Sequence, residues 1–291
     1  MTKIPSIHTQ SLKIPKPILI AGKLISFISP KLTTLFAAKL FTTPIKHKIP
    51  KREFEMDEKS EQKKLLVPSI NKEIVVYKYG QSEKKVLLVH GWSGRGTQLV
   101  KIADALVKHG YSTISFDAPA HGKSPGNQSI MTEFIAAILE IDKQYGPFES
   151  AVGHSLGGMS VLNAVKEGLE LNTAVIIGSG DIVQDIIEDF IAKLELKPSY
   201  ATTLRLYFEK KHGGKMNDYS GYQAAKKITI PILVIHDKDD PEVPVKASRN
   251  IYEHLKNGEL LITEGLGHRK ILGDSEVVKR TVEYVTTHSN N

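Results

Sequence analysis

The 291-residue sequence contains no cysteine. This absence excludes disulfides, thiol nucleophiles and cysteine-ligated metal sites, and it agrees with a reducing compartment. No apolar run is as long as a membrane-spanning helix. The histidines show neither H-E-x-x-H nor a comparable spacing, so no metal site is expected. We therefore expect a cytoplasmic protein that uses no metal and no other cofactor.

Acidic side chains are absent from residues 1–52, which hold ten of the 39 Lys and Arg residues. The remaining residues hold 29 basic and 32 acidic side chains, and so carry a net charge of −3. The formal charge of +7 thus arises from the N-terminal segment. Because the rest of the chain is mildly acidic, we expect no binding of nucleic acid by it.

We interpret residues 1–64 as a basic helical arm that ends in a charged linker at 51–64. Its apolar stretch is interrupted by Lys23, and Ser29-Pro30 is typical of the start of a helix, here reaching about Phe41. Lys23 and the prolines argue against a signal peptide. Peripheral contact with an anionic membrane surface would suit the charge, but an arm packed on its own domain or on a partner is favoured.

Residues 65–291 form the second predicted unit, in which short apolar strands alternate with helices. This alternation predicts an α/β fold with a mostly parallel, doubly wound sheet that is covered on both faces. Strands are expected at 74–79, 86–90, 113–116, 151–152, 174–177, 231–236 and 260–263. Helices are expected at 99–109, 131–145, 159–169, 245–255 and 276–286.

The alternation breaks at about 181–225, where the pattern predicts two helices with no strand between them. An insertion at the sheet edge where ligands bind is a natural place for a lid. This one is rich in aromatic residues, and Tyr207 and Phe208 are candidate substrate contacts. The alternative is that the aromatic residues only pack the two helices onto the body.

Ser155 stands at the centre of Gly153-His154-Ser155-Leu156-Gly157-Gly158, a G-x-S-x-G pattern. An apolar strand precedes it and a helix-forming run follows, which places the serine at the apex of a sharp turn. Such a turn requires small neighbours and exposes the serine oxygen. It also places the next N–H at the start of a helix, where negative charge is favoured. By itself, the pattern fits an ordinary glycine-rich connection equally well.

A serine hydroxyl needs an adjacent base, usually a histidine that a carboxylate orients. His268 follows the last predicted strand, and Asp237, Asp239 and Asp240 follow the strand before it. Because the carboxyl ends of parallel strands meet at one edge of the sheet, these side chains are expected near Ser155.

In this order of motifs the sequence resembles the α/β-hydrolase superfamily, over about residues 70–290. The resemblance implies a triad of Ser155 as nucleophile, Asp240 as acid and His268 as base. The aspartate is placed by the segment His236 to Pro244, which is similar to the superfamily's His-Gly-x-x-Asp-x-x-Val-Pro.

His90-Gly91-Trp92 resembles the oxyanion loop of the superfamily. The resemblance implies that the N–H groups of Trp92 and Leu156 bind the oxyanion. The indole of Trp92 is also a candidate wall of the acyl pocket. A further stretch that is similar to the superfamily contains Asp117 and His121, which we interpret as structural.

Other chemically capable residues are interpreted as framework. Asp239 is the alternative acid, whereas Asp237 stands where the superfamily usually has glycine and is interpreted as a loop residue. His154 and His236 border the motifs without a chemical role. The glycines of 91–96 lack the Gly-Lys-Ser/Thr ending of a phosphate-binding loop.

These motifs together predict a cofactor-independent serine hydrolase that cleaves an acyl bond, a carboxylic ester or a thioester, through an acyl-enzyme. The expected partner is a small-molecule acyl substrate. Two alternatives stay open. The same residues serve acyl transfer or carbon–carbon bond hydrolysis equally well, and a relative that only binds ligands would also keep the fold.

Overall fold

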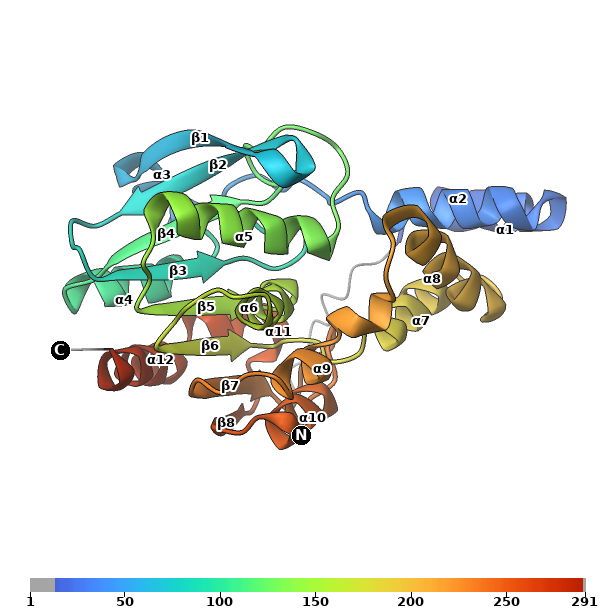
Figure 1. Cartoon of the computed structure of the whole chain (residues 1–291). Helices are drawn as coiled ribbons and strands as arrows, with labels where there is room; N and C mark the ends of the chain where they lie inside the picture. Colours follow the sequence, from blue (N-terminus) through green and yellow to red (C-terminus); the bar gives the residue numbers. More distant parts are fainter. Residues whose placement is uncertain (1–13, 290–291) are drawn as a thin grey trace, which may run out of the picture.

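An eight-stranded sheet forms the centre of the computed structural model, which describes residues 14–289 (Figure 1). The strand order is β1-β2-β4-β3-β5-β6-β7-β8. The β1–β2 and β2–β4 pairs are antiparallel and the others are parallel, which confirms the predicted α/β fold. The strands are β1 (Glu61–Val67), β2 (Lys72–Tyr79), β3 (Lys85–Val89), β4 (Ser112–Asp117), β5 (Ser150–His154), β6 (Thr173–Ile177), β7 (Ile232–Asp237) and β8 (Gly258–Thr263).

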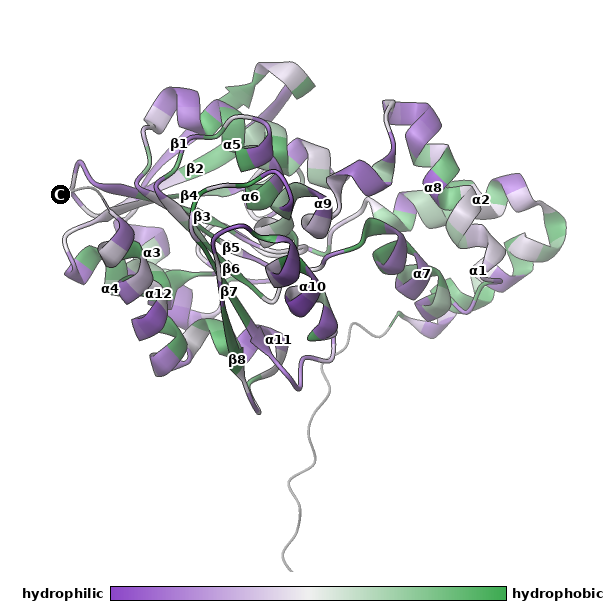
Figure 2. Ribbon diagram, turned by 60° about the horizontal axis from the view of Figure 1, so that its bottom comes forward, coloured by the Kyte–Doolittle hydropathy of each residue, from purple (hydrophilic) through white to green (hydrophobic). Residues whose placement is uncertain are grey.

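Helices cover both faces of the sheet (Figure 2). Four of them pack on one face, where Ile138, Leu162 and Ile251 are fully buried; these are α5 (Met131–Tyr145), α6 (Leu156–Lys166), α9 (Gly221–Ala225) and α10 (Lys246–His254). The other face is covered by α3 (Phe54–Lys59), α4 (Val100–Lys108) and α12 (Ser275–His288), with Met56 and Val285 fully buried.

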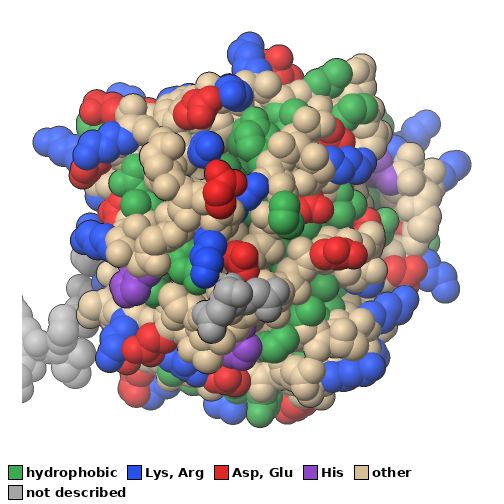
Figure 3. Space-filling model, turned by 60° about the vertical axis from the view of Figure 1, so that its left-hand side comes forward, with side chains coloured by type: hydrophobic (Ala, Val, Ile, Leu, Met, Phe, Trp, Pro, Cys, Tyr) green, Lys and Arg blue, Asp and Glu red, His purple; other side chains and the backbone are tan. Residues whose placement is uncertain are grey.

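The central strands form continuous apolar runs because both of their faces are covered. Every residue of β5, β6 and β7 is buried. The molecular surface differs from this core. On the face that Figure 3 shows, basic and acidic side chains are interspersed and hydrophobic side chains form small groups.

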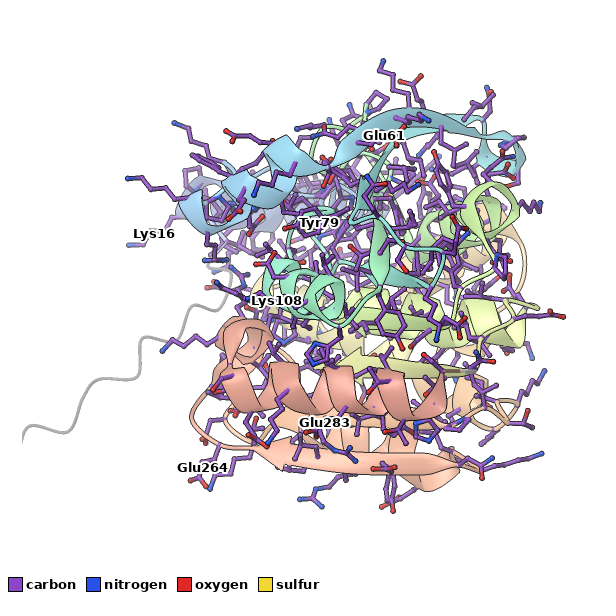
Figure 4. The ribbon with its side chains drawn as sticks, turned by 90° about the vertical axis from the view of Figure 1, so that its left-hand side faces the viewer. Lys16, Glu61, Tyr79, Lys108, Glu264 and Glu283 are labelled. Atoms are coloured by element: carbon purple, nitrogen blue, oxygen red, sulfur yellow. The ribbon has the colours of Figure 1, made fainter. Side chains whose placement is uncertain are left out.

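Residues 51–64 do not form the predicted linker. They contain α3 and the first half of β1, which is the edge strand next to β2. Figure 4 shows Glu61 at this edge of the sheet and Glu264 at the opposite edge, after β8. Lys64 Nζ lies 2.9 Å from a carboxylate oxygen of Glu73 on β2. The charged composition that suggests a linker therefore belongs to a solvent-facing edge strand whose pairing partner follows later in the sequence.

The N-terminal arm is a helical hairpin of α1 (Lys16–Ile28) and α2 (Pro30–Phe41). Ser29 caps α2, since its Oγ accepts a hydrogen bond from the Leu32 N–H (3.3 Å). Lys3 and Lys13, which contribute to the basic charge of the arm, fall outside the described residues. None of the helices between residues 14 and 289 combines the length and the apolar character needed to cross a bilayer.

The hairpin packs on the helices of the 181–225 insertion, α7 (Val183–Lys193) and α8 (Ser199–His212). The four helices, which we call the cap, share a hydrophobic cluster in which Ala37, Ile187 and Leu204 are fully buried. Figure 1 shows the cap projecting from one side of the sheet. The arm is thus packed on its own domain, the favoured one of its three interpretations.

Hydrogen bonds also join the chain after α2 to the body. The Ile45 N–H donates to Ser93 Oγ (3.0 Å), and Thr42 O accepts from the Ser129 N–H (2.8 Å). Lys46 Nζ donates to Ser124 O (2.7 Å). These bonds anchor the second end of the hairpin beside the loop that contains Trp92.

Candidate active site

Ser155 occupies a strained turn between β5 and α6. Its φ of 54° and ψ of −120° lie in a region that L side chains rarely adopt. The neighbouring glycines leave no room for a side chain, since a Cβ at Gly157 would lie 2.3 Å from the Val89 carbonyl oxygen. A Cβ at Gly153 would lie 2.6 Å from the Gly157 carbonyl oxygen. The G-x-S-x-G pattern thus reflects how closely strand, turn and helix pack here.

Backbone hydrogen bonds hold Ser155 in this conformation. Its N–H donates to the Ile177 carbonyl oxygen at the end of β6 (2.8 Å), and its carbonyl oxygen accepts from the Gly158 N–H (3.0 Å). Its hydroxyl has no hydrogen-bond partner among the described residues, so it can turn toward a base or a substrate.

His268 and Asp240 form a close pair at the carboxyl edge of the sheet. His268 Nδ1 donates to Asp240 Oδ2 at 2.6 Å, and both side chains are almost fully buried. The other oxygen, Oδ1, accepts from the N–H groups of Glu242 (2.8 Å) and Val243 (2.9 Å). Because the carboxylate is fixed on both oxygens, it orients the imidazole with Nε2 away from Asp240.

Asp240 is held in its charged form. Burial alone would raise its pKa, but hydrogen bonds from His236, from His268 and from the Val243 N–H outweigh that effect and hold the pKa well below its usual range. His236 Nε2 lies 3.4 Å from Asp240 Oδ2 and also bonds to the Val243 carbonyl oxygen (2.9 Å). His236, interpreted as framework, therefore contacts Asp240 directly.

The other two aspartates stabilise the loops. Asp237 accepts hydrogen bonds from the N–H groups of Leu266 (3.1 Å) and Gly267 (2.9 Å), and Asp239 accepts one from the Gly265 N–H (2.9 Å). They thus tie the loop after β7 to the loop that carries His268. Burial would raise the pKa of Asp237, but hydrogen bonds from the Gly267 N–H, the Thr263 hydroxyl and the Leu266 N–H together lower it below its usual range.

Trp92 and Leu156 lie on opposite sides of Ser155 in the sequence but line the same cavity. Neither backbone N–H donates a hydrogen bond to another described residue. The Leu156 N–H belongs to the first residue of α6, where the helix dipole favours an anion. Gly91 allows the two segments to approach, because a Cβ there would lie only 3.0 Å from that of Ser155.

Three buried histidines surround these loops and are held neutral. Burial lowers the pKa of His121 to about 4 and that of His154 to about 3, and it lowers the pKa of His90 well below its usual range. His90 Nε2 accepts from the Ala118 N–H (3.0 Å), and His154 Nε2 bonds to the His268 carbonyl oxygen (2.9 Å).

Asp117 lies under the Trp92 loop without lining the cavity. Its carboxylate accepts hydrogen bonds from Tyr77 Oη (2.8 Å) and from the N–H groups of Gly96 (2.7 Å) and Lys123 (2.6 Å). Burial nevertheless raises its pKa above the usual range. These hydrogen bonds hold the Trp92 loop and the turn after β4 together, as expected of a structural residue.

Ser155, His268 and Asp240 open onto one cavity of about 1100 Å³. Trp92 and Phe208 line it, whereas Tyr207 does not and instead packs against Phe208, with ring centroids 5.3 Å apart. The cavity lies between the body and the cap. Its wall is built from the loops after the strands, the start of α6, and the cap helices.

The arm supplies part of this wall, which the sequence did not predict. Ile14, Ile18 and Phe41 line the cavity, and the Phe41 ring packs edge-on against Phe190 of α7 at 5.1 Å. It also lies 5.7 Å from the Phe208 ring. Phe41 stands at the predicted end of the second arm helix, but nothing local tied it to residue 155.

Glu242 and Arg269 form a charged pair on the cavity wall, with Arg269 Nε 3.1 Å from Glu242 Oε1. Glu242 Oε2 is 4.0 Å from His268 Nε2, the nitrogen that faces away from Asp240. Across residues 14–289, no three His, Asp or Glu side chains are grouped to hold a metal ion.

Residues 86–280 match the model of the alpha/beta hydrolase family. Similar solved structures include an esterase from Exiguobacterium antarcticum (TM-score 0.61, 18% identity, 78% of this chain and 100% of that chain). A bromoperoxidase from Bacillus anthracis has a TM-score of 0.60 at 16% identity, over 78% of this chain and 100% of its own. A monoacylglycerol lipase from Paleococcus ferrophilus has a TM-score of 0.58 at 20% identity, over 74% and 99%. At these identities the likeness is one of fold. No curated protein sequence matches the chain.

Proposed function

Given that the chain belongs to the alpha/beta hydrolase family, we propose that it is a serine hydrolase that cleaves an acyl bond, a carboxylic ester or a thioester. The observation that carries the proposal is the 2.6 Å contact between His268 and Asp240 on the cavity that Ser155 also lines. The family relationship alone would leave the reaction open, since one fold serves many chemistries.

In the proposed first step, Ser155 Oγ attacks the carbonyl carbon and His268 Nε2 takes its proton. Asp240, ionised throughout, accepts the hydrogen bond from Nδ1 and stabilises the imidazolium. The carbonyl oxygen becomes an oxyanion, for which the Trp92 and Leu156 N–H groups are the donors. Such donors are each worth about 10²–10³ in rate where they have been removed.

His268 then returns the proton to the leaving group as the carbon–oxygen or carbon–sulfur bond breaks, which leaves an acyl-Ser155 ester. Water attacks this ester, with His268 as base, and the acid is released as the serine regains its proton. No cofactor takes part in these proposed steps. The apolar wall that Trp92, Phe41 and Phe208 give the cavity favours a substrate with an apolar acyl group.

The test is labelling of the intact protein by a fluorophosphonate probe, which reacts with activated serines. Wild type is expected to be labelled and Ser155→Ala is not. Ser160→Ala is the matched control, because Ser160 lies one turn further along α6, away from the cavity, and its loss should leave labelling intact. Absence of labelling in the wild type refutes the activated serine.

A panel of esters and thioesters of increasing acyl length then tests turnover. Asp240→Asn is expected to lower kcat by about 10³–10⁴, because it removes the charge that fixes the imidazole. Labelling without turnover of any member of the panel would favour the alternatives, acyl transfer or a relative that only binds ligands.

A further inference from the structure

The outward face of the α1–α2 hairpin is apolar and uncovered. The exposed fraction is 88% for Phe27 and 76% for Ile28, although both are large apolar side chains. Figure 2 shows the turn between the two helices, at the tip of the cap, as hydrophobic. The patch, as we call this surface, consists of Ile20, Leu24, Phe27 and Ile28 of α1 with Leu32 and Leu35 of α2.

The patch is distinct from the faces that build the cap. The four residues of α1 follow one another at spacings of four, three and one, which places them on one stripe of the helix. Ala37 and Ala38 of α2 are turned the other way, into the hydrophobic cluster that α2 shares with α7 and α8. The cap core is therefore complete without the patch, and the exposed residues contribute nothing to it.

Elsewhere in residues 14–289 the exposed large hydrophobic residues are spread over different parts of the chain. They are Ile45, in the segment after α2, and Phe54, Leu66, Leu206 and Tyr252, each on a different element. Isolated residues of this kind are normal, whereas a contiguous apolar surface marks a site of interaction.

Lysines accompany the patch. Lys16, Lys31 and Lys39 are exposed on the same two helices, and Lys23 is paired with Glu195, which follows α7. Residues 1–52 contain no acidic side chain that would neutralise the others. An apolar helix face flanked by cations is complementary to a bilayer with anionic headgroups, into which the apolar side chains insert while the lysines stay at the phosphates.

We propose that this patch docks the protein on an anionic lipid surface. A second copy of the chain is a poorer occupant, because a two-fold contact would bring the same lysine-flanked surface against itself with no acidic partner from either hairpin. The patch lies outside residues 86–280, the part of the chain that matches the family.

Docking has a consequence for the cavity. α1 both carries the patch and, through Ile18, lines the cavity that contains Ser155. The docked hairpin thus brings the cap side of the cavity to the bilayer, where an apolar acyl substrate would be concentrated. This consequence rests on the proposed function, whereas the docking itself does not.

The test is co-sedimentation of the full chain with vesicles of phosphatidylcholine alone and with vesicles that also contain phosphatidylglycerol. We expect binding to the mixed vesicles that weakens as salt is added. Leu24→Asp/Phe27→Asp should lower the partition coefficient at least about tenfold. The matched control is Leu66→Asp/Tyr252→Asp, which makes the same change at two exposed residues of the body and should bind like wild type.

Both double variants change exposed residues that do not line the cavity, so each should keep its melting temperature and its fluorophosphonate labelling. Equal binding by Leu24→Asp/Phe27→Asp and wild type would overturn the proposal, as would no binding of wild type to mixed vesicles. A wild-type dimer that the patch variant converts to a monomer, measured by light scattering, would also overturn it in favour of a second copy. Because vesicle binding needs no turnover, failure here is distinguishable from failure of the hydrolase proposal.

Discussion

Ser155→Gly should make the protein more stable while abolishing its labelling. Ser155 is held at φ 54°, ψ −120°, a conformation that costs an L side chain about 1–3 kcal/mol and that glycine adopts freely. Ser155→Ala also removes the hydroxyl but keeps the Cβ, and so keeps the strain. The comparison of the two variants therefore isolates the backbone from the loss of the hydroxyl.

The expected difference is modest. Glycine adds conformational freedom to the unfolded chain, which offsets about 0.4–1 kcal/mol of the relieved strain. Ser155→Gly should then exceed Ser155→Ala in unfolding free energy by about 1 kcal/mol. For a chain of this length, unfolding entropy of about 2 cal/mol/K per residue converts that into a rise in Tm of about 2 °C.

Differential scanning calorimetry of the two variants measures the difference, and Ser160 supplies the control. Ser160 lies within α6, where glycine is about 1 kcal/mol worse than alanine. Ser160→Gly should therefore melt below Ser160→Ala, the opposite order from residue 155. If Ser155→Gly melts at or below Ser155→Ala, the turn does not store the strain that its backbone angles imply.

Three further outcomes are expected. Glu53→Ala should destabilise the protein by about 3–5 kcal/mol in urea unfolding. The change leaves the largely buried Arg95 guanidinium, which lies 2.9 Å from the Glu53 carboxylate, without its partner. Glu53→Gln keeps a hydrogen-bonding group and should cost less. His121 and His154 have pKa values of about 4 and about 3 in the folded protein, so the unfolded chain binds more protons below pH about 6.5. Stability should thus fall on acidification by about 1.4 kcal/mol per histidine for each pH unit below that value, and His121→Gln should flatten the profile of Tm between pH 7 and 5; an unchanged slope would contradict the buried neutral form. Phe41→Leu should enlarge the cavity and shift the preference in kcat/KM toward longer acyl chains by about tenfold per methylene, measured on the ester panel. An unchanged preference would mean that the arm does not limit the size of the acyl site.

Much of the fold could be read from local patterns. The strands from β2 to β8 are short apolar runs bounded by turn residues, and the helix predicted at 131–145 matches α5, Met131–Tyr145, in both bounds. The predicted start of α6 was three residues late, because the glycines after Ser155 disguise a helix whose first turn must be small to pack against β3 and β5. In each case the residues that predict the helix or strand are the same residues that form it.

β1 illustrates what a local pattern cannot show. Its first residues, Glu61 to Lys64, have the composition of a solvated linker, and only pairing with β2 makes them a strand. The arm illustrates the same limit, because its helices were readable from Ser29-Pro30 whereas their contact with α8, some 170 residues later, was not.

For the candidate site, the sequence by itself determined the sharp turn that carries Ser155, since Gly153 must lack a side chain to pack against Gly157 four residues later. It also determined the order of serine, aspartate and histidine at strand ends. The resemblance had pointed to Asp240 as the partner of His268. Only the tertiary structure showed their contact, the hydrogen bonds by which Asp237 and Asp239 tie the loops together, and the place of the arm in the cavity wall. The reason is physical: side-chain pairs across loops and helices depend on where the whole sheet places the chain, and a local run of residues carries no record of that placement.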